Sequence, residues 1–455
     1  MATQVFYTQS LETKKGSRIW LEGKRLEDAG FGPGQKYQVI YNREQKRLEL
    51  IATSAGERIV SKKSRYDQIL PIIDICNDSV TKIFGPGTPV VAKVQDGRIV
   101  ITQHQIESNR RIRESEMAML LNNDGEVLEG SLCSGGGVST HAIHEGMKSA
   151  GVNSKVSLLA EYDPRYLQVA KRLFPYVETI HQGKIEDVLL EDIPRLNVLS
   201  FSLPCTGHSI AGKTKNKIKT AEEHKDASTA VFGALKYIVQ SNPAVIISEN
   251  VIQAKDSATY ILLKAEIKRI GYEIKEFILD EKQAGSIEKR KRYWFVAISS
   301  GFKSVLNEIE PKIYSKKYNT VGEALDKDYS GDWMPASYYD SRLEKNIQNG
   351  RGFSKNFATD NTEQTNVITR HYTKRQISNP HYHKGDKIRL FTVAEHARLM
   401  GIPEMILEGV ADTVGHEILG QSILYNQAHG LSSAVMAAIK NLVAEKKEKV
   451  IQVAG

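Results

Sequence analysis

Strand-like and helix-like segments alternate between residues 127 and 299, and this alternation constrains the fold more than any other feature. The expected strands are short and apolar, whereas the expected helices are longer and amphipathic. Such alternation predicts an α/β fold with a mostly parallel, doubly wound, Rossmann-like sheet. The expected strands are 127–133, 156–160, 196–202, 244–248, 272–279 and 293–299, and the expected helices are 139–148, 164–173, 227–241 and 257–271.

A glycine-rich turn follows the first expected strand. It contains Gly135 and Gly137, and the helix after it has Ser139 or Thr140 as its expected N-cap. The second strand ends at Glu161, whose carboxylate can accept two hydrogen bonds from ribose hydroxyls. Together these features predict a site for an adenosine-bearing cofactor, and both nicotinamide dinucleotides and S-adenosylmethionine fit it.

Pro204 and Cys205 follow the strand expected at 196–202. Proline cannot donate to a sheet ladder and fixes its own backbone angle, so Pro204 would end the strand and hold the Cys205 thiol at its mouth. A buried cysteine that packs as a small hydrophobe is the alternative.

The strand expected at 244–248 would deliver Glu249 and Asn250 to the edge of the sheet where Cys205 lies. A thiolate can add to carbon 6 of cytosine only if the charge that builds on the ring is neutralised, and a carboxyl group near ring nitrogen 3 would do this. Carbon 5 would then take a methyl group from a sulfonium donor. Arg290 and Arg292 open the last strand, where they could hold a phosphate or lower the pKa of the thiol.

These motifs resemble those of the cytosine-5 DNA methyltransferases. Pro204-Cys205, Glu249-Asn250-Val251 and Arg290-x-Arg292 follow the glycine-rich turn in the order of that family. The resemblance covers residues 125 to about 438, including the late segment 389–403 and the final segment Leu419-Gly-Gln-Ser-Ile. It implies an S-adenosylmethionine-dependent enzyme that methylates carbon 5 of cytosine in duplex DNA after flipping the base.

The resemblance also implies roles for single residues. Cys205 would be the nucleophile, and Glu249 would protonate or hydrogen-bond the ring nitrogen. Arg290 and Arg292 would be the partners of the cytosine carbonyl and of the active-site framework. Asn250 would hold the backbone of the Pro204-Cys205 turn. The residues implied for the cofactor are Ser134, Gly135, Gly137, Glu161, Tyr162, Ile185 and Ser422. Lysines of a loop at 206–226 would close over the DNA, with a plain solvated loop as the alternative.

Five positions depart from the family pattern. Cys133 replaces an aromatic residue expected to stack on adenine, and Val138 replaces a glycine. Lys184 stands in place of an acidic residue, Glu288 in place of a glutamine, and Gln421 in place of an asparagine. We expect cofactor binding to survive these mild changes, with Cys133 as buried filler.

Residues 1–105 differ from the rest, because short strands alternate with turns and the segment contains a repeat. Phe31-Gly-Pro-Gly and its following strands return as Phe84-Gly-Pro-Gly with similar strands. Half a barrel cannot cover its apolar face, so two copies would close one small β-barrel. The first copy resembles AbrB-type and SymE-like swapped-hairpin barrels, which commonly bind DNA as dimers. A packing or dimerisation module without DNA contacts is the alternative.

The remaining segments complete the expected domains. Residues 106–124 would be a linker helix, 125–302 and 389–455 the catalytic domain, and 303–388 the inserted target recognition domain that the family has there. Two further functions stay open: methylation of RNA cytosine, and a DNA-binding transcription regulator with a degenerate methyltransferase body.

The net charge of +8 and the pI near 9.0 favour a polyanionic partner, here duplex DNA, and a restriction endonuclease is a candidate protein partner. No apolar run is long enough to span a membrane, and the three scattered cysteines suit neither a disulfide framework nor a metal site. We therefore expect a cytoplasmic, nucleoid-associated protein. The target sequence and the oligomeric state do not follow from the sequence.

Overall fold

The computed structural model describes residues 2–65, 68–205, 225–350 and 354–454. The chain forms two compact units, residues 1–112 and 113–455. The loop expected at 206–226 lies outside the described residues, apart from its last two positions. No helix in the described part of the chain is both long enough and apolar enough to cross a membrane.

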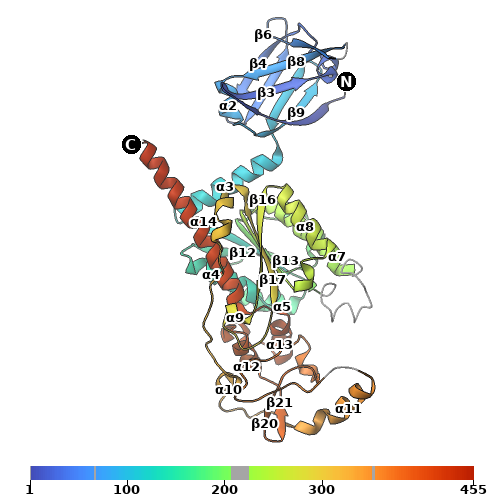
Figure 1. The fold of residues 1–455 in the computed structure, drawn as a ribbon, viewed down its shortest axis with the longest axis vertical. Coiled ribbons are helices and arrows are strands. Elements are labelled where there is room, and N and C mark those ends of the chain that lie inside the picture. Colours follow the sequence, from blue (N-terminus) through green and yellow to red (C-terminus); the bar gives the residue numbers. More distant parts are fainter. Residues whose placement is uncertain (1, 66–67, 206–224, 351–353, 455) are drawn as a thin grey trace. The chain divides into compact units, whose positions relative to one another are not determined.

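The first unit consists of two antiparallel sheets around one core (Figure 1). Two short helices, α1 (Lys24–Asp28) and α2 (Asp78–Ile83), accompany them. The six-stranded sheet has the order β1 (Gln4–Gln9), β9 (Pro89–Gln95), β10 (Arg98–Gln103), β5 (Arg47–Ala52), β4 (Lys36–Asn42), β6 (Arg58–Ile59). The four-stranded sheet has the order β2 (Leu11–Thr13), β3 (Gly16–Glu22), β8 (Gln68–Cys76), β7 (Ser61–Arg65).

The two copies of the sequence repeat pair through equivalent strands. β3 pairs antiparallel with β8, which places Ile19 opposite Ile75, and β5 pairs antiparallel with β10. Both sheets are therefore symmetric about the junction between the copies. Alternate side chains such as Ile19 and Ile75 are fully buried in the shared core, so each copy covers the apolar face of the other. The resemblance to AbrB-type barrels stays a prediction.

The second unit is built on a seven-stranded sheet, which confirms the predicted α/β architecture (Figure 1). All strands are parallel except β17, which runs antiparallel to both its neighbours. The short strand β13 was not predicted. The order is β13 (Thr179–Gln182), β12 (Ser154–Glu161), β11 (Val127–Leu132), β14 (Val198–Phe201), β15 (Val245–Asn250), β17 (Arg292–Ser299), β16 (Tyr272–Leu279).

Helices cover both faces of this sheet, as the doubly wound pattern predicts. Val245 and Ile247 of β15 face a core with α4 (Val138–Ser149) and α14 (Tyr425–Ala454). Ile246 of the same strand faces the opposite core with α7 (Lys225–Ser241) and α8 (Ala258–Arg269). The alternation along one strand thus sends side chains to two separate cores. Helix α5 (Pro164–Leu173) lies beside β12.

The predicted N-cap of α4 was wrong. The helix begins at Val138 after Gly137, whose φ of 84° lies in the left-handed region, and no side chain caps it. Thr140 Oγ1 instead donates to Ser131 Oγ at 2.8 Å and so ties α4 to β11. Helix α14 crosses α4 closely, because a Cβ atom at Gly146 would lie 2.1 Å from Ser432 Oγ.

The segment 303–388 carries short elements instead of the βα alternation. Its four-stranded sheet is β18 (Met334–Pro335), β21 (Lys387–Arg389), β20 (His381–Lys384), β19 (Phe357–Ala358). The helices α10 (Val321–Ala324) and α11 (Asp340–Gln348) lie in the same segment, and α12 (Val393–Leu399) and α13 (Asp412–Gln421) follow it.

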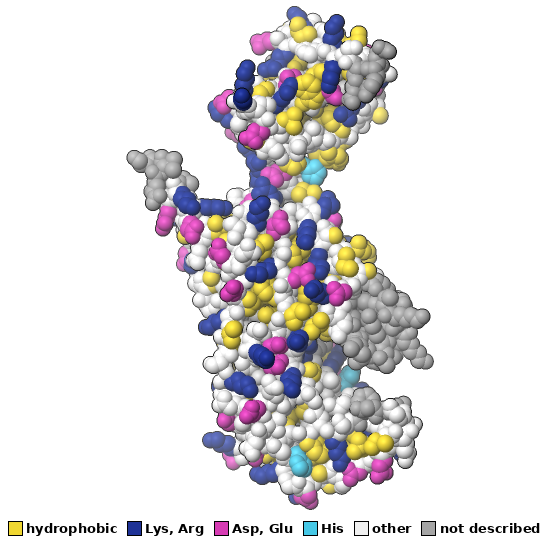
Figure 2. Space-filling model, in the orientation of Figure 1, with side chains coloured by type: hydrophobic (Ala, Val, Ile, Leu, Met, Phe, Trp, Pro, Cys, Tyr) yellow, Lys and Arg dark blue, Asp and Glu magenta, His cyan; other side chains and the backbone are white. Residues whose placement is uncertain are grey.

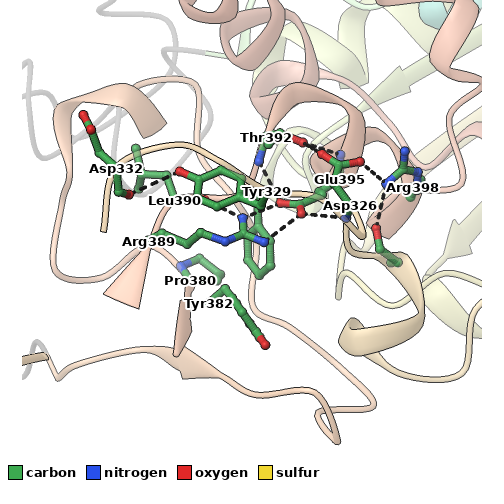
Figure 3. A network of polar contacts seen from close by, with 12 residues as sticks. Asp326, Tyr329, Asp332, Pro380, Tyr382, Arg389, Leu390, Thr392, Glu395 and Arg398 are labelled. Carbon is green, nitrogen blue, oxygen red and sulfur yellow. Dashed lines mark hydrogen bonds and ion pairs between the residues drawn. The ribbon is translucent and has the colours of Figure 1, made fainter. Parts of the chain in front are cut away.

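A buried ion pair joins this segment to the helix after it (Figure 3). Arg389 donates two hydrogen bonds, at 2.6 and 2.8 Å, to the carboxylate of Glu395, and neither residue is more than 1% exposed. The guanidinium also lies 3.9 Å over the ring of Tyr329. Glu395 further accepts from the backbone N–H groups of Thr392 and Asp326, both at 2.9 Å. The backbone at Asp326 and the C-terminal end of the segment are therefore held at one carboxylate.

Arg389→Ala should lower the free energy of unfolding by about 3–5 kcal/mol, because it leaves the Glu395 carboxylate buried without its cation. Urea unfolding followed by tryptophan fluorescence measures this. The matched control is Arg269→Ala, since Arg269 pairs with Glu266 at the surface, and an exposed pair contributes about 0–1 kcal/mol. Equal losses in the two variants would contradict a central role for Arg389.

Candidate active site

One cavity of about 520 Å³ opens at the carboxyl ends of β11, β12, β14 and β15. Ligands of open α/β sheets bind at this edge. The cavity brings together all the predicted site residues except Gly137 and Arg290. Those that line it are Ser134, Gly135, Glu161, Tyr162, Ile185, Pro204, Cys205, Glu249, Asn250, Arg292 and Ser422.

Glu249 lies at the end of β15 with both carboxylate oxygens engaged. Ser202 Oγ donates to Oε2 at 2.8 Å, and Arg292 Nε lies 3.0 Å from Oε1. Burial raises the pKa of the Glu249 carboxyl, and the Arg292 guanidinium and the Ser202 hydroxyl only partly oppose this. A raised pKa makes the carboxyl easier to protonate and suits it to donate a proton or a hydrogen bond.

Cys205 lies in the same cavity, three residues after Ser202, and its side chain is exposed there. Burial nevertheless raises the pKa of the thiol, because the surrounding protein removes much of its hydration, while the Arg292 guanidinium lowers it. Asn250 Nδ2 donates to the carbonyl oxygen of Leu203 at 2.9 Å, directly before Pro204 and Cys205. Asn250 therefore fixes the backbone that carries the thiol.

The two arginines occupy different places. Arg292 faces the cavity beside Glu249, whereas Arg290 is fully buried behind its wall. Arg290 donates to the carbonyl oxygens of Ser422 at 2.7 Å, Gly420 at 3.1 Å and Ile368 at 3.0 Å. It also bonds Glu288 Oε1 at 2.7 Å. Arg290 thus supports the cavity wall and does not line the cavity.

Glu288 occupies the position where the sequence departs from the expected glutamine. Its carboxylate is fully buried between Arg290 and His396, whose Nε2 lies 3.5 Å away. Burial acts to raise the pKa of Glu288, but the Arg290 guanidinium and the contact with the His396 imidazole outweigh burial and hold the pKa below its ordinary value. The ionised carboxylate at this position matches the buried guanidinium beside it.

The glycine turn and Glu161 form the other end of the cavity. Gly135 N–H donates to Glu161 Oε2 at 2.7 Å, and Asp163 N–H donates to Oε1 at 2.9 Å. A Cβ atom at Gly135 would meet nothing within 4 Å, so open space lies over the turn. At Gly137 a Cβ atom would lie 3.1 Å from the Cα of Ala170. The absence of a side chain at Gly137 therefore allows the start of α4 to pack closely against α5.

The cavity fits an adenosyl cofactor. Its volume lies within the range of about 300–1,000 Å³ that is usual for small-molecule sites. Glu161 keeps free lone pairs for ribose hydroxyls, and the buried Ser134 Oγ has no hydrogen-bond partner within the described residues. Burial raises the pKa of the Cys133 thiol far above its ordinary value, which fits filler and not a second nucleophile.

Sequence reasoning missed several lining residues, notably Ser202, Tyr166 and Arg370. Ser202 comes two residues before Pro204 and could have been found from its strand end. Tyr166 lies in the first turns of α5, which follows Glu161. Arg370 belongs to the segment 303–388, and no local pattern connects it to the cavity.

The comparisons with known proteins agree with this geometry. The family model for C-5 cytosine-specific DNA methylase matches residues 130–436. The Type II methyltransferase M1.ScrFI of Lactococcus lactis subsp. cremoris is 23% identical over 265 residues, which cover 57% of this chain and 67% of the relative. The Type II methyltransferase M.NlaX of Neisseria lactamica is 24% identical over 279 residues, which cover 58% and 83%.

A solved structure shows the same fold. The Entamoeba histolytica methyltransferase EhMeth matches with a TM-score of 0.55 and 17% sequence identity, covering 70% of this chain and 99% of that chain. The family model covers more than half of the chain and every residue that lines the cavity. The chain therefore belongs to the C-5 cytosine-specific DNA methylase family and is a DNA cytosine-5 methyltransferase.

Proposed function

We propose that this enzyme methylates cytosine through a covalent bond between Cys205 and the base, with S-adenosylmethionine as the methyl donor. The observation that carries the proposal is the meeting of Cys205, Glu249 and Arg292 at one end of a cavity whose other end holds Gly135 and Glu161. The candidate nucleophile Cys205, the candidate acid Glu249 and the candidate nucleoside site at Glu161 therefore lie in one cavity.

The chemistry follows from the positions of these side chains. Cys205 sulfur, as the thiolate, forms a bond to carbon 6, and Glu249 gives a proton or hydrogen bond to nitrogen 3. Carbon 5 then accepts the methyl group of the sulfonium, whose carbon–sulfur bond breaks. The carbon 5 proton is lost to a base, and the sulfur leaves with the electron pair of its bond to carbon 6. Because Cys205 lies inside a cavity, the cytosine must leave the base stack to reach it.

Arg292 has two roles in this proposal. It holds Glu249 in place at 3.0 Å and offers further donors to the cytosine carbonyl. Its charge also favours the thiolate form of Cys205. The remaining predicted residues would hold the donor: Glu161 at the ribose, Tyr162 and Ile185 at the adenine, and Ser134, Gly135 and Ser422 at the amino-acid end. Gly137 does not line the cavity, so it would affect the donor only by shaping the glycine-rich turn before α4.

We further assign segment 303–388 as the target recognition domain of a duplex-DNA enzyme, flanked by the catalytic segments 125–302 and 389–455. Its small sheet is held to the catalytic part through Arg389 and Glu395. A restriction endonuclease would be the protein partner if the enzyme belongs to a restriction-modification pair. A purely regulatory DNA-binding role is weaker because Cys205 and Glu249 are both in place. RNA cytosine is weaker because the long segment 303–388 suits a base-reading domain and the family model is one of DNA methylases.

The first unit is proposed as an accessory DNA-binding module. Residues 1–112 contain 18 Lys and Arg against 12 Asp and Glu, a net charge of +6, out of +8 for the whole chain. Lys and Arg side chains lie around exposed hydrophobic side chains on the face of this unit seen in Figure 2. A basic unit of this kind supplies sequence-independent attraction to phosphates.

Cys205→Ala should abolish methyl transfer to duplex DNA, because Cys205 is the thiol beside Glu249 and Arg292, whereas burial keeps the other described cavity thiol, Cys133, protonated. Labelled S-adenosylmethionine measures the transfer. DNA containing 5-fluorocytosine should trap a covalent adduct with the wild-type protein and with the control Cys76→Ala, but not with Cys205→Ala. Methylation by Cys205→Ala at the wild-type rate would end the proposal, and preferred labelling of transfer RNA would redirect it to RNA.

Glu249→Gln should lower kcat by about 10²–10⁴, since an amide cannot transfer a proton to nitrogen 3. Single-turnover methylation measures the rate. The control is Glu276→Gln on β16, which removes a carboxylate that pairs with Lys264 away from the cavity. A rate for Glu249→Gln equal to that of the control would show that Glu249 takes no part in the chemistry.

Removal of residues 1–104 should weaken DNA binding and reduce its dependence on salt, while kcat at saturating DNA stays close to that of the full chain. Fluorescence anisotropy at several salt concentrations measures the binding. Unchanged affinity and an unchanged salt slope would assign the first unit a structural role.

A further inference from the structure

We infer that Arg370, which comes from the segment 303–388, binds the carboxylate at the amino-acid end of the methyl donor. This inference rests on the proposed function, because it takes S-adenosylmethionine as the ligand. It adds a cofactor contact from a part of the chain that is proposed to read DNA.

The backbone at Arg370 is fixed against the cavity wall. A Cβ atom at Gly420 would lie 2.4 Å from the backbone nitrogen of Arg370, so only glycine permits this close approach. The preceding residues are held as well: Ile368 O accepts from Arg290, and Thr369 N–H donates to Asn379 Oδ1 at 3.1 Å. The contacts with Gly420, Arg290 and Asn379 thus fix the backbone position of Arg370.

The guanidinium of Arg370 lines the cavity and has donors to spare. Its Nη2 donates to the hydroxyl of Tyr166 at 2.9 Å, and that hydroxyl donates to Glu417 Oε2 at 2.7 Å. Its Nε is shielded from solvent and has no hydrogen-bond partner within the described residues. No direct ion pair joins Arg370 to a carboxylate of the described residues, although its charge helps to lower the pKa of Asp163, which also lines the cavity. A half-buried cation in this state is suited to an anionic ligand.

The surroundings of Arg370 indicate which part of the ligand it meets. Its neighbours Tyr166 and Gly420 belong to α5 and α13, and the same two helices pack on the glycine turn. Gly137 contacts Ala170 of α5, and a Cβ atom at Gly136 would lie 2.7 Å from Ile418 of α13. Arg370 is therefore the cavity cation on the side of the glycine turn.

The other two cations that line the cavity, Arg292 and Lys184, lie away from the glycine turn. Arg292 pairs with Glu249 beside Cys205, and Lys184 precedes Ile185. The turn beside Arg370 also opens α4, a helix of 12 residues whose first backbone N–H groups favour negative charge. The carboxylate is the only anionic group of S-adenosylmethionine. It is therefore the group that Arg370 and the N-terminus of α4 are expected to bind.

The test compares two ligands that differ only in this carboxylate. Isothermal titration calorimetry on the full chain measures the binding of S-adenosylhomocysteine and of its decarboxylated analogue, without DNA. Arg370→Met keeps the apolar stem and removes the guanidinium. It should weaken S-adenosylhomocysteine binding by about 10–100-fold and change binding of the analogue by less than about twofold.

Lys374→Met is the matched control, because Lys374 is an exposed cation four residues further along the same segment and does not line the cavity. It should leave both affinities unchanged. Equal weakening of both ligands in Arg370→Met would show a merely structural role, and no weakening of either would equally overturn the inference.

Two further measurements keep the test decisive. If Arg370→Met does not fold, Arg370→Lys replaces it, and a loss for S-adenosylhomocysteine alone is again expected because lysine lacks the planar fork. Wild-type protein that binds neither ligand would overturn the proposed cofactor. Wild-type protein that binds both ligands equally well would overturn only the role of Arg370.

Discussion

The site depends on one buried cation, Arg290. It has no contact with solvent, and its hydrogen bonds reach the end of α13 at Gly420 and Ser422 and the inserted segment at Ile368. Three segments that are distant in sequence therefore meet at one guanidinium. Glu288 lies 2.7 Å from this guanidinium, so its carboxylate balances the buried charge of Arg290.

The reactive end of the cavity shows how one environment acts on two groups. Burial raises the pKa of both Cys205 and Glu249, which keeps the acid able to donate but also keeps the thiol protonated. Arg292 opposes both shifts because it lies beside both groups. Without DNA, the cavity favours the neutral forms of Cys205 and Glu249. We therefore expect the thiolate of Cys205 to form only when DNA is bound and the cytosine lies beside it.

Much of this arrangement could be predicted from the sequence. Cys205 and Glu249 follow neighbouring parallel strands, and the carboxyl ends of such strands meet at one edge, so their proximity follows from pattern alone. β13 was missed because Thr179–Gln182 is short and only partly buried. Gly137 was expected at the cofactor but serves helix packing, which depends on Ala170 in another helix. Arg370 reaches the cavity only through long-range contacts of an irregular segment, and no periodicity encodes such contacts.

The repeat in the first unit has a consequence of its own. A homodimer must carry the same residues on both halves, whereas two copies within one polypeptide can diverge while they keep a common core. The hairpin of the second copy, β7 with β8, has a longer edge strand and presents Lys62 and Lys63, whereas the equivalent strand β2 presents Glu12. Duplication within the chain has thus allowed the two hairpins to differ in strand length and in the charge that their edge strands present.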